Sequence, residues 1–180
     1  MFSGEIKSVE DLLRNFKFKR LESKGEKFGI DELKSRLEKL LIDNEDNFNK
    51  NPELFIGTDS KKRGPFVYFA LVVILYFEKS GGAVFFCRNV EKIKMNMESR
   101  LIREAEYSLA AATKLVDLCN EYAIPMSIHC DYNPNPAHKS NGVVSAALGY
   151  ITGMGFNGKI KPDSWAATTA ADLIVKGVRN

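Results

Sequence analysis

Four carboxylates, Asp59, Glu104, Asp131 and Asp163, each fall at the end of an expected strand or on an expected helix. If the fold brings them to one edge of a sheet, their charges repel one another unless cations neutralise them. Two Mg²⁺ or Mn²⁺ ions are the natural counter-charge, because these hard cations prefer oxygen ligands. Two such ions about 4 Å apart activate a water and stabilise the leaving oxygen of a phosphodiester. The pattern therefore predicts metal-dependent phosphodiester chemistry.

The first two acids differ in how they are presented. Asp59 closes the apolar strand in "ELFIGTDSKKRG". Glu104 lies on a long helix expected over residues 97–122, where side chains three and four residues apart share a face. It borders the apolar stripe and lies over the small residues Ser108 and Ala111, which leave room for a ligand. The alternatives for Glu104 are pairing with Arg100 or Arg103, and Glu98 is the substitute acid. The stripe consists of Leu101, Ala105, Ala112 and Leu115.

In "SIHCDYN", alternation along a strand places His129 and Asp131 on the same face. Asp131 then ends its strand, although an Asp followed by turn residues also fits a simple turn. A neutral His129 imidazole near Asp131 could orient a ligand or move a proton. The alternative for His129 is a structural histidine held by hydrogen bonds.

The last helix, expected from about residue 163 to 176, offers two acids. Asp163 shares a face with Ala166, Ala170 and Ile174, whereas Asp172 lies about half a turn away at ~100° per residue. Asp163 is therefore the predicted inward acid. A second interpretation remains for it, because Asp at a helix start is also a good N-cap.

The elements that must position these acids follow from the apolar periodicity. Residues 1–50 predict a charged helical appendage, with a helix near 30–41 and a shorter one near 9–16. Residues 51–180 predict one α/β domain in the order β β β α β α β α. Its strands are expected in "LFIGTDS", "PFVYFALVVILYF", "AVFFCRNV", "PMSIHCDY" and "KIK", with turns at 61–64 and 79–82 and a helix near 140–154.

Composition narrows the class of protein. The 26 basic and 23 acidic residues give a net charge of +3, which permits a polyanionic partner without requiring one. Cys87, Cys119 and Cys130 are widely spaced in apolar runs, which predicts reduced thiols and a cytoplasmic protein. The longest apolar run, Phe66 to Phe77, is shorter than the ~18 residues of a membrane helix, and the N-terminus lacks the apolar region of a signal peptide.

The motifs "IGTDS", "RLIRE", "HCD" and "KIKPDSWAATTAAD" together resemble a small bacterial ribonuclease H-like family, predicted nucleases grouped with the resolvase-type enzymes. The resemblance covers about residues 54–177. It implies a five-stranded mixed sheet in the order 3-2-1-4-5, flanked by helices. It also implies that Asp59, Glu104, Asp131 and Asp163 are the metal ligands and catalytic acids.

Several residues near the acids suit a nucleic-acid partner. Lys61, Lys62 and Arg63 follow Asp59 in an expected hairpin and could contact phosphates, or could serve solubility alone. Lys139 and Ser140 begin the next helix and could also meet a phosphate. Trp165 is interpreted as a packing residue in preference to a base-stacking platform.

These observations lead to one main hypothesis, a nuclease that uses two Mg²⁺ or Mn²⁺ ions to hydrolyse DNA, RNA or a hybrid. Its catalytic residues would be Asp59, Glu104, Asp131 and Asp163, with His129. The alternative is a non-catalytic module that binds nucleic acid or a protein partner. A small-molecule phosphotransferase is disfavoured, because the chain lacks a glycine-rich phosphate loop. A resolvase-like role would favour a homodimer.

Overall fold

A six-stranded mixed sheet forms the centre of the molecule. The computed structural model describes residues 8–21, 25–44, 51–132, 141–172 and 174. The sheet order is β1-β4-β3-β2-β5-β6, with β5 parallel to β2 and to β6 and the other pairs antiparallel. The expected order 3-2-1-4-5 is confirmed for β4-β3-β2-β5-β6, and β1 is an additional strand. The strands are β1 (Lys19–Arg20), β2 (Pro52–Arg63), β3 (Phe66–Phe77), β4 (Gly81–Lys92), β5 (Met126–Cys130) and β6 (Asn157–Lys159).

Two tight turns join the three long strands. Gly64, between β2 and β3, and Gly81, at the start of β4, both have positive φ, a conformation that favours glycine. A Cβ at Gly82 would lie 2.2 Å from the carbonyl oxygen of Leu75, so this position admits only glycine without a shift of the backbone. The turns fix the register in which Phe66 faces both Arg63 and Lys92.

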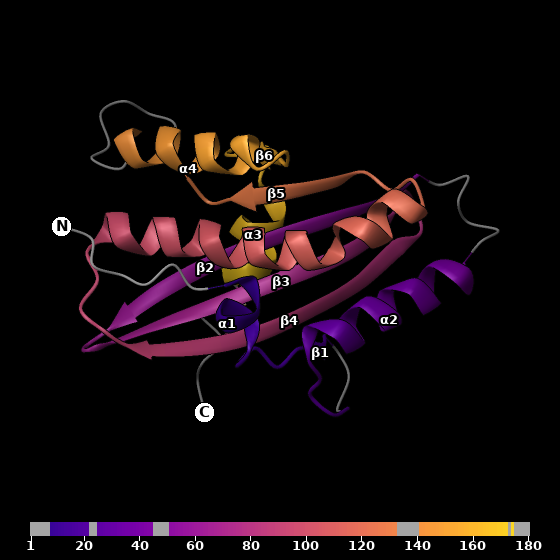
Figure 1. Ribbon diagram of the computed structural model, residues 1–180, viewed down its shortest axis with the longest axis horizontal. Helices are drawn as coiled ribbons and strands as arrows, with labels where there is room; N and C mark the ends of the chain where they lie inside the picture. The colour runs from indigo at the N-terminus through magenta and orange to yellow at the C-terminus, as the bar shows by residue number, and fades with distance from the viewer. Residues whose placement is uncertain (1–7, 22–24, 45–50, 133–140, 173, 175–180) are drawn as a thin grey trace.

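Helices cover the two faces of the sheet unequally (Figure 1). One face carries α1 (Val9–Leu13), α2 (Ile30–Ile42), α3 (Met97–Glu121) and α4 (Asn141–Gly153), whereas the π-helical segment η2 (Ala166–Ala171) lies behind the sheet. α3 starts where the Asn96 side chain accepts a hydrogen bond from the Ser99 N–H at 2.7 Å. Within the described residues, no helix is long and apolar enough to cross a membrane.

Alternation along β2 supplies both faces with core residues. Leu54 and Ile56 belong to the large core beneath α1–α4. Phe55 belongs to a smaller core with Ala171 and Ile174 of the closing helical segment. Asp59 and Ser60 continue the same alternation, so Asp59 lies on the η2 face and Ser60 on the α3 face.

The N-terminal segment shares the large core. Leu33, Leu37 and Leu41 of α2 are fully buried in it, and the Phe16 ring meets the Tyr107 ring of α3 at 4.7 Å. The two-residue strand β1 pairs with Phe85 and Phe86 of β4. The division of the chain into two units at residue 50 stays a prediction. The residues before and after this point pack around one core.

Three element boundaries near the site differ from those expected. β2 continues to Arg63, through most of the turn predicted at 61–64. β6 is Asn157–Lys159 where "KIK" was predicted, and the closing helical segment begins near Trp165. Asp163 lies instead in the preceding turn, where its N–H donates to the Ile160 carbonyl at 2.9 Å. Because η2 has no side-chain cap, Asp163 does not serve as its N-cap.

Candidate active site

Hydrogen bonds link β2 to α3 beside the candidate acids. The hydroxyls of Thr58 and Ser108 lie 2.8 Å apart, and the Ser60 hydroxyl donates to Oε1 of Glu104 at 2.7 Å. All four side chains are buried. A polar strip of this kind inside an apolar core holds the Glu104 carboxyl at a fixed point above the end of β2.

The site lies where β2 and β5 part. Their parallel pairing ends at Thr58 and Cys130, while β2 continues to Arg63. Asp59 therefore follows the last paired residue of β2, and Asp131 follows the last residue of β5. Carboxylates from both layers can meet at this gap, because Glu104 approaches from α3 and Asp59 faces η2. The ends of parallel strands are the usual place for ligands in such sheets.

The electrostatics show that these acids share one environment. The pKa of Glu104 is raised to about 8, chiefly by burial and also by the charges of Asp59 and Asp131, against the opposing effects of Ser60 and Arg100. Burial likewise raises the pKa of Asp59 to about 6, with Asp131 and Asp172 adding to the rise. The Ser60 backbone and Arg100 oppose this second shift. Buried carboxyl groups whose pKa is raised by neighbouring carboxylates form a site that favours a cation.

Asp131 has a cation beside it. Its buried Oδ1 lies 2.5 Å from Nζ of Lys161, in the turn after β6. The Lys161 side chain is about half exposed, whereas that of Asp131 is 23 % exposed. Lys161 thus neutralises one acid of the site, a role that the sequence did not indicate.

The two acids near η2 occupy different positions from those expected. Asp163 is exposed, and the only described pKa that it shifts is that of His129. Asp172 is half-buried and raises the pKa of Asp59. The projection at 100° per residue failed here because the helix starts after Asp163 and its π-helical turns are wider. The ligand role of Asp163 stays a prediction, and Asp172 is the acid that the structure brings toward Asp59.

His129 is committed to the fold through both ring nitrogens. Nδ1 accepts the Ala166 N–H at 3.1 Å, and Nε2 lies 3.1 Å from the Ser127 hydroxyl. Since Nδ1 is an acceptor, the proton belongs on Nε2 and the ring is neutral. Burial lowers the pKa of His129 to about 4, with Lys159 adding to the shift and Asp163 opposing it. These contacts favour the structural alternative for His129, which positions the start of η2, and its catalytic role stays a prediction.

The fold and the site now allow comparison with known proteins. The chain matches the family model described as Ribonuclease H-like over residues 36–176, which is more than half of its length. The chain belongs to the ribonuclease H-like family. Searches of curated proteins and of solved structures find no significant match. The resemblance predicted from the motifs is thus confirmed at the level of the family.

The ribonuclease H-like region begins within α2 and ends in the closing helical segment. It includes Asp59, Glu104 and Asp131 at the gap between β2 and β5, and Asp163 and Asp172 near η2. A family of this kind indicates a nuclease-type module that interacts with nucleic acid. The additional strand β1 and helix α1 lie before the matched region.

The donor set suits a hard divalent cation, although the site is not assembled for one. Carboxylate oxygens are the ligands that Mg²⁺ and Mn²⁺ prefer, and the buried Oδ1 of Asp131 faces a cation already. Among the residues that the structure describes, no three His, Cys, Asp or Glu side chains are arranged to hold a metal ion. An ion would therefore have to displace Lys161 from Asp131 and deprotonate Glu104.

The structure describes three of the five residues predicted to contact phosphates. Lys61, Lys62 and Arg63 end β2 beyond Asp59, and Nζ of Lys62 donates to the Met95 carbonyl at 3.4 Å. The Arg63 guanidinium lies 5.6 Å from the Tyr68 ring centre. Lys139 and Ser140 lie outside the described residues, so their contacts stay predictions.

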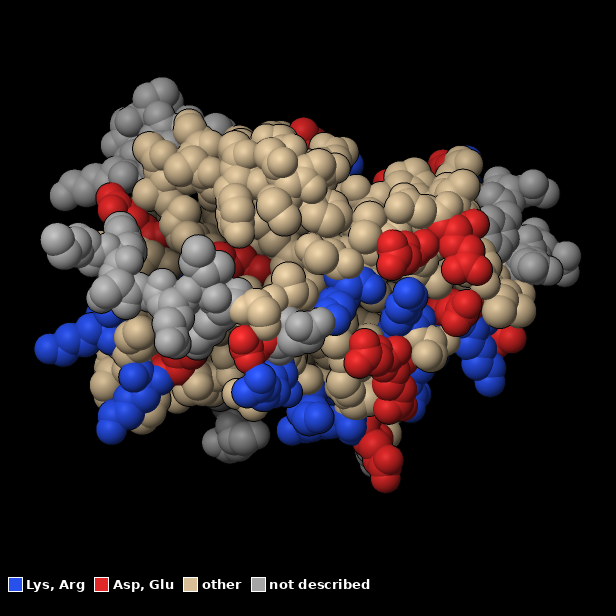
Figure 2. All heavy atoms as spheres, in the orientation of Figure 1, with Lys and Arg blue, Asp and Glu red and all other residues tan. Residues whose placement is uncertain are grey.

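The face seen in Figure 2 adds no extended basic patch. Lys and Arg side chains alternate with Asp and Glu over its lower half, and the surface over α4 is uncharged.

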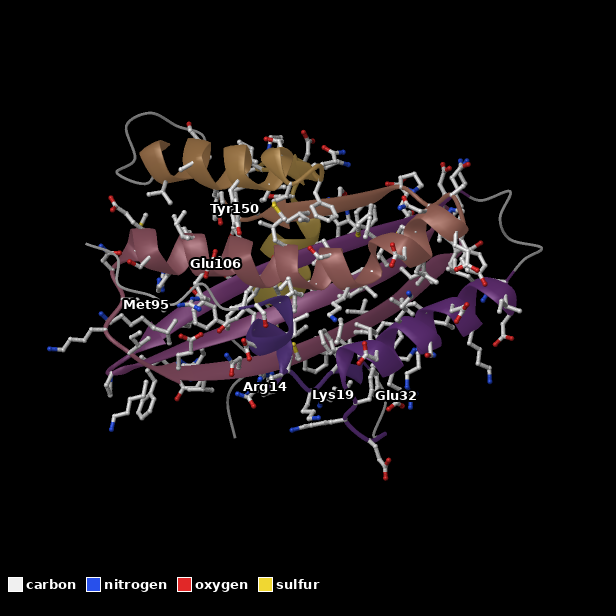
Figure 3. The ribbon with its side chains drawn as sticks, in the orientation of Figure 1. Arg14, Lys19, Glu32, Met95, Glu106 and Tyr150 are labelled. Atoms are coloured by element: carbon white, nitrogen blue, oxygen red, sulfur yellow. The ribbon has the colours of Figure 1, made fainter. Side chains whose placement is uncertain are left out.

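Glu106, two residues after Glu104, is half-buried and pairs with Arg103 at 3.3 Å (Figure 3). Glu106 is therefore held in an ion pair along α3.

Proposed function

We propose that the protein is a metal-dependent nuclease that hydrolyses phosphodiester bonds of nucleic acid with two divalent ions. The observation that carries this proposal is the convergence of Asp59, Glu104 and Asp131 at the gap between β2 and β5, where the charges of Asp59 and Asp131 both raise the pKa of Glu104. A membership in the ribonuclease H-like family supports it. Buried carboxyl groups whose charges repel one another stabilise the fold poorly, so their convergence fits a cation site.

In this proposal the cations are Mg²⁺ or Mn²⁺, held by Asp59, Glu104, Asp131 and Asp172. When bound, such ions stabilise the negative charge of a phosphodiester and lower the pKa of a coordinated water. The protein's own residues set the geometry. Ser60 orients Glu104 through its hydrogen bond, and Lys161 balances the charge of Asp131 until a stronger cation arrives.

The nucleic-acid backbone would approach along the basic end of the β2–β3 hairpin. Lys61, Lys62 and Arg63 follow Asp59 directly, so phosphates on either side of the cleaved bond fall within their reach. Contacts of this type predict binding that weakens as salt rises. The proposal includes phosphate contacts by Lys139 and Ser140, which precede α4 in the sequence. It also includes a cytoplasmic location and a homodimer.

One observation favours a second candidate function, a ribonuclease H-like module that binds nucleic acid without cutting it. Lys161 already neutralises Asp131, and the acids as described do not form a ready metal cluster. In such a module the site would keep its internal ion pair and divalent ions would have no effect.

Cleavage of a labelled panel separates the two functions. The panel holds a single strand, a duplex, an RNA/DNA hybrid and a four-way junction, each incubated with Mg²⁺, with Mn²⁺ or with EDTA. The nuclease proposal predicts cleavage in the presence of the ions and its loss in Asp59→Asn. Equal inertness of native and variant protein, with nucleic-acid binding retained by both, would establish the binding module instead.

A further inference from the structure

The only tryptophan of the chain, Trp165, is 41 % exposed at the entry to η2. Its ring meets the Phe55 ring at 4.9 Å in an edge-on contact and the Tyr76 ring at 6.4 Å. His129 lies 6.0 Å away. Three neighbours thus fix the orientation of the indole while much of its surface stays in contact with solvent.

Trp165 lies on the same face of the sheet as Asp59. Phe55, which contacts the indole, and Asp59 are four residues apart on β2 and alternate to the η2 side. Four residues of strand span about 13 Å. A few nucleotides therefore reach from a phosphate at the carboxylate site to a base at Trp165.

Basic side chains accompany the aromatic cluster. Nζ of Lys159 lies 5.9 Å from the centre of the Phe55 ring, and Lys161 is about half exposed in the following turn. Exposed Asp163, two residues before Trp165, offsets part of this charge. The region is accordingly suited to a ligand that brings an aromatic ring together with a moderate negative charge.

We propose that Trp165 is a stacking platform for an unpaired base of single-stranded nucleic acid whose backbone continues to the carboxylate site. Every base has a π face, so stacking on an exposed indole binds single strands with little sequence preference. A base within a duplex is already stacked on its neighbours and does not meet the platform. This inference rests on the proposed function and adds to it that the bound nucleic acid is single-stranded near the site.

Trp165 provides its own reporter, because its fluorescence is the only tryptophan signal of the protein. The titration uses the full chain in EDTA, where the oligonucleotide stays uncut. A single-stranded oligonucleotide is expected to quench the fluorescence to saturation. The same oligonucleotide with abasic sites throughout is expected to quench it weakly and to bind about tenfold more weakly.

Matched variants separate stacking from a packing role. Trp165→Ala is expected to bind a labelled single strand about tenfold more weakly, whereas Trp165→Tyr retains near-native binding. Tyr150→Ala is the control, since Tyr150 is 49 % exposed on α4, across the sheet (Figure 3), and is expected to bind like the native protein. Circular dichroism and urea unfolding identify any variant that has lost its fold. If Trp165→Ala is unfolded, Trp165→Phe replaces it as a variant with a weaker stacking platform.

The inference is overturned if a saturating single strand leaves the fluorescence unchanged, or if Trp165→Ala binds as tightly as the native protein. Its failure is separate from that of the nuclease proposal. Cleavage without quenching would contradict the stacking platform and leave the nuclease proposal intact. Quenching without cleavage under Mg²⁺ or Mn²⁺ would support the platform and contradict the nuclease.

Discussion

Ser60 on β2 and Glu104 on α3 are joined by a 2.7 Å hydrogen bond in which the serine hydroxyl donates to the buried carboxyl. Glu104 is 4 % exposed and Ser60 is 9 % exposed. The bond crosses from the sheet to its helical layer and fixes the Glu104 side chain over the end of β2.

Removal of this donor is expected to destabilise the protein. Ser60→Ala leaves a buried carboxyl oxygen without its donor, which should lower the free energy of unfolding by about 1–2 kcal/mol. Urea unfolding at pH 7 in EDTA measures the loss. Ser145→Ala, at an exposed position of α4, is the matched control and should unfold like the native protein. Identical midpoints for Ser60→Ala and the control would show that the bond does not stabilise the fold.

Stability is expected to fall as pH rises from 6.5 to 8. Burial raises the pKa of Glu104 from 4.5 to about 8 in the folded protein, so the folded state holds a proton that the unfolded state releases. The stabilisation is complete below the unfolded pKa and disappears as pH passes through the folded one. Over this range the unfolding free energy should fall by about 1–2 kcal/mol.

The comparison with Glu104→Gln isolates Glu104, because the lowered pKa of His129 still affects stability slightly above pH 6.5. Below pH 6.5, His129 with its lowered pKa favours stability as pH rises, and Asp59 with its raised pKa opposes this below pH 6. Urea unfolding in EDTA at four pH values gives the slope. Glu104→Gln should flatten it, and an equal slope in native and variant protein would exclude Glu104 as the source.

The ion pair between Lys161 and Asp131 predicts competition with divalent ions. Lys161→Met removes the cation that an ion must displace, so Mn²⁺ should bind about fivefold more tightly, the range expected for a partly exposed pair. Lys161→Arg keeps the charge and should resemble the native protein. Calorimetric titration gives the affinities. Unchanged or weaker binding in Lys161→Met would mean that Lys161 supports the ion, or is irrelevant to it.

Substitution of Asp163 and of Asp172 tests which acid near the closing helical segment binds a divalent ion. Asp172 raises the pKa of Asp59, whereas Asp163 is exposed in the preceding turn. Asp172→Asn should therefore weaken Mn²⁺ binding by about tenfold or more, and Asp163→Asn should leave it near the native value. The opposite ranking would restore Asp163 as the ligand predicted from the sequence.

The long elements were predictable because their patterns are strong. The apolar runs of β2, β3 and β4 and the periodicity of α3 extend over many residues, and the α3 boundaries agree with the prediction within one residue. The strand β1 could not be predicted, because it has two residues and depends on pairing with Phe85 and Phe86 far along the chain. The strand order came from the resemblance, since apolar patterns do not specify which strands are neighbours.

The candidate site was predictable only in part for the same reason. Asp59, Glu104 and Asp131 follow from the expected strands and a regular α-helix, although β2 continues beyond Asp59 to Arg63. Lys161 could not be found, because its contact with Asp131 depends on how the turn after β6 folds. The inward position of Asp172 required knowledge of the π-helical winding, and the role of His129 required its contact with Ala166, which lies 37 residues away.

The most direct test of the central claim, that the acids at the gap between β2 and β5 bind divalent ions, is a calorimetric Mn²⁺ titration. Native protein and Asp59→Asn are compared at pH 7.5, with Asp117→Asn at an exposed position of α3 as the control. We expect saturable binding to the native protein and the control, and binding at least about tenfold weaker to Asp59→Asn. Equal titrations for all three proteins, or no binding to any of them, would contradict the claim.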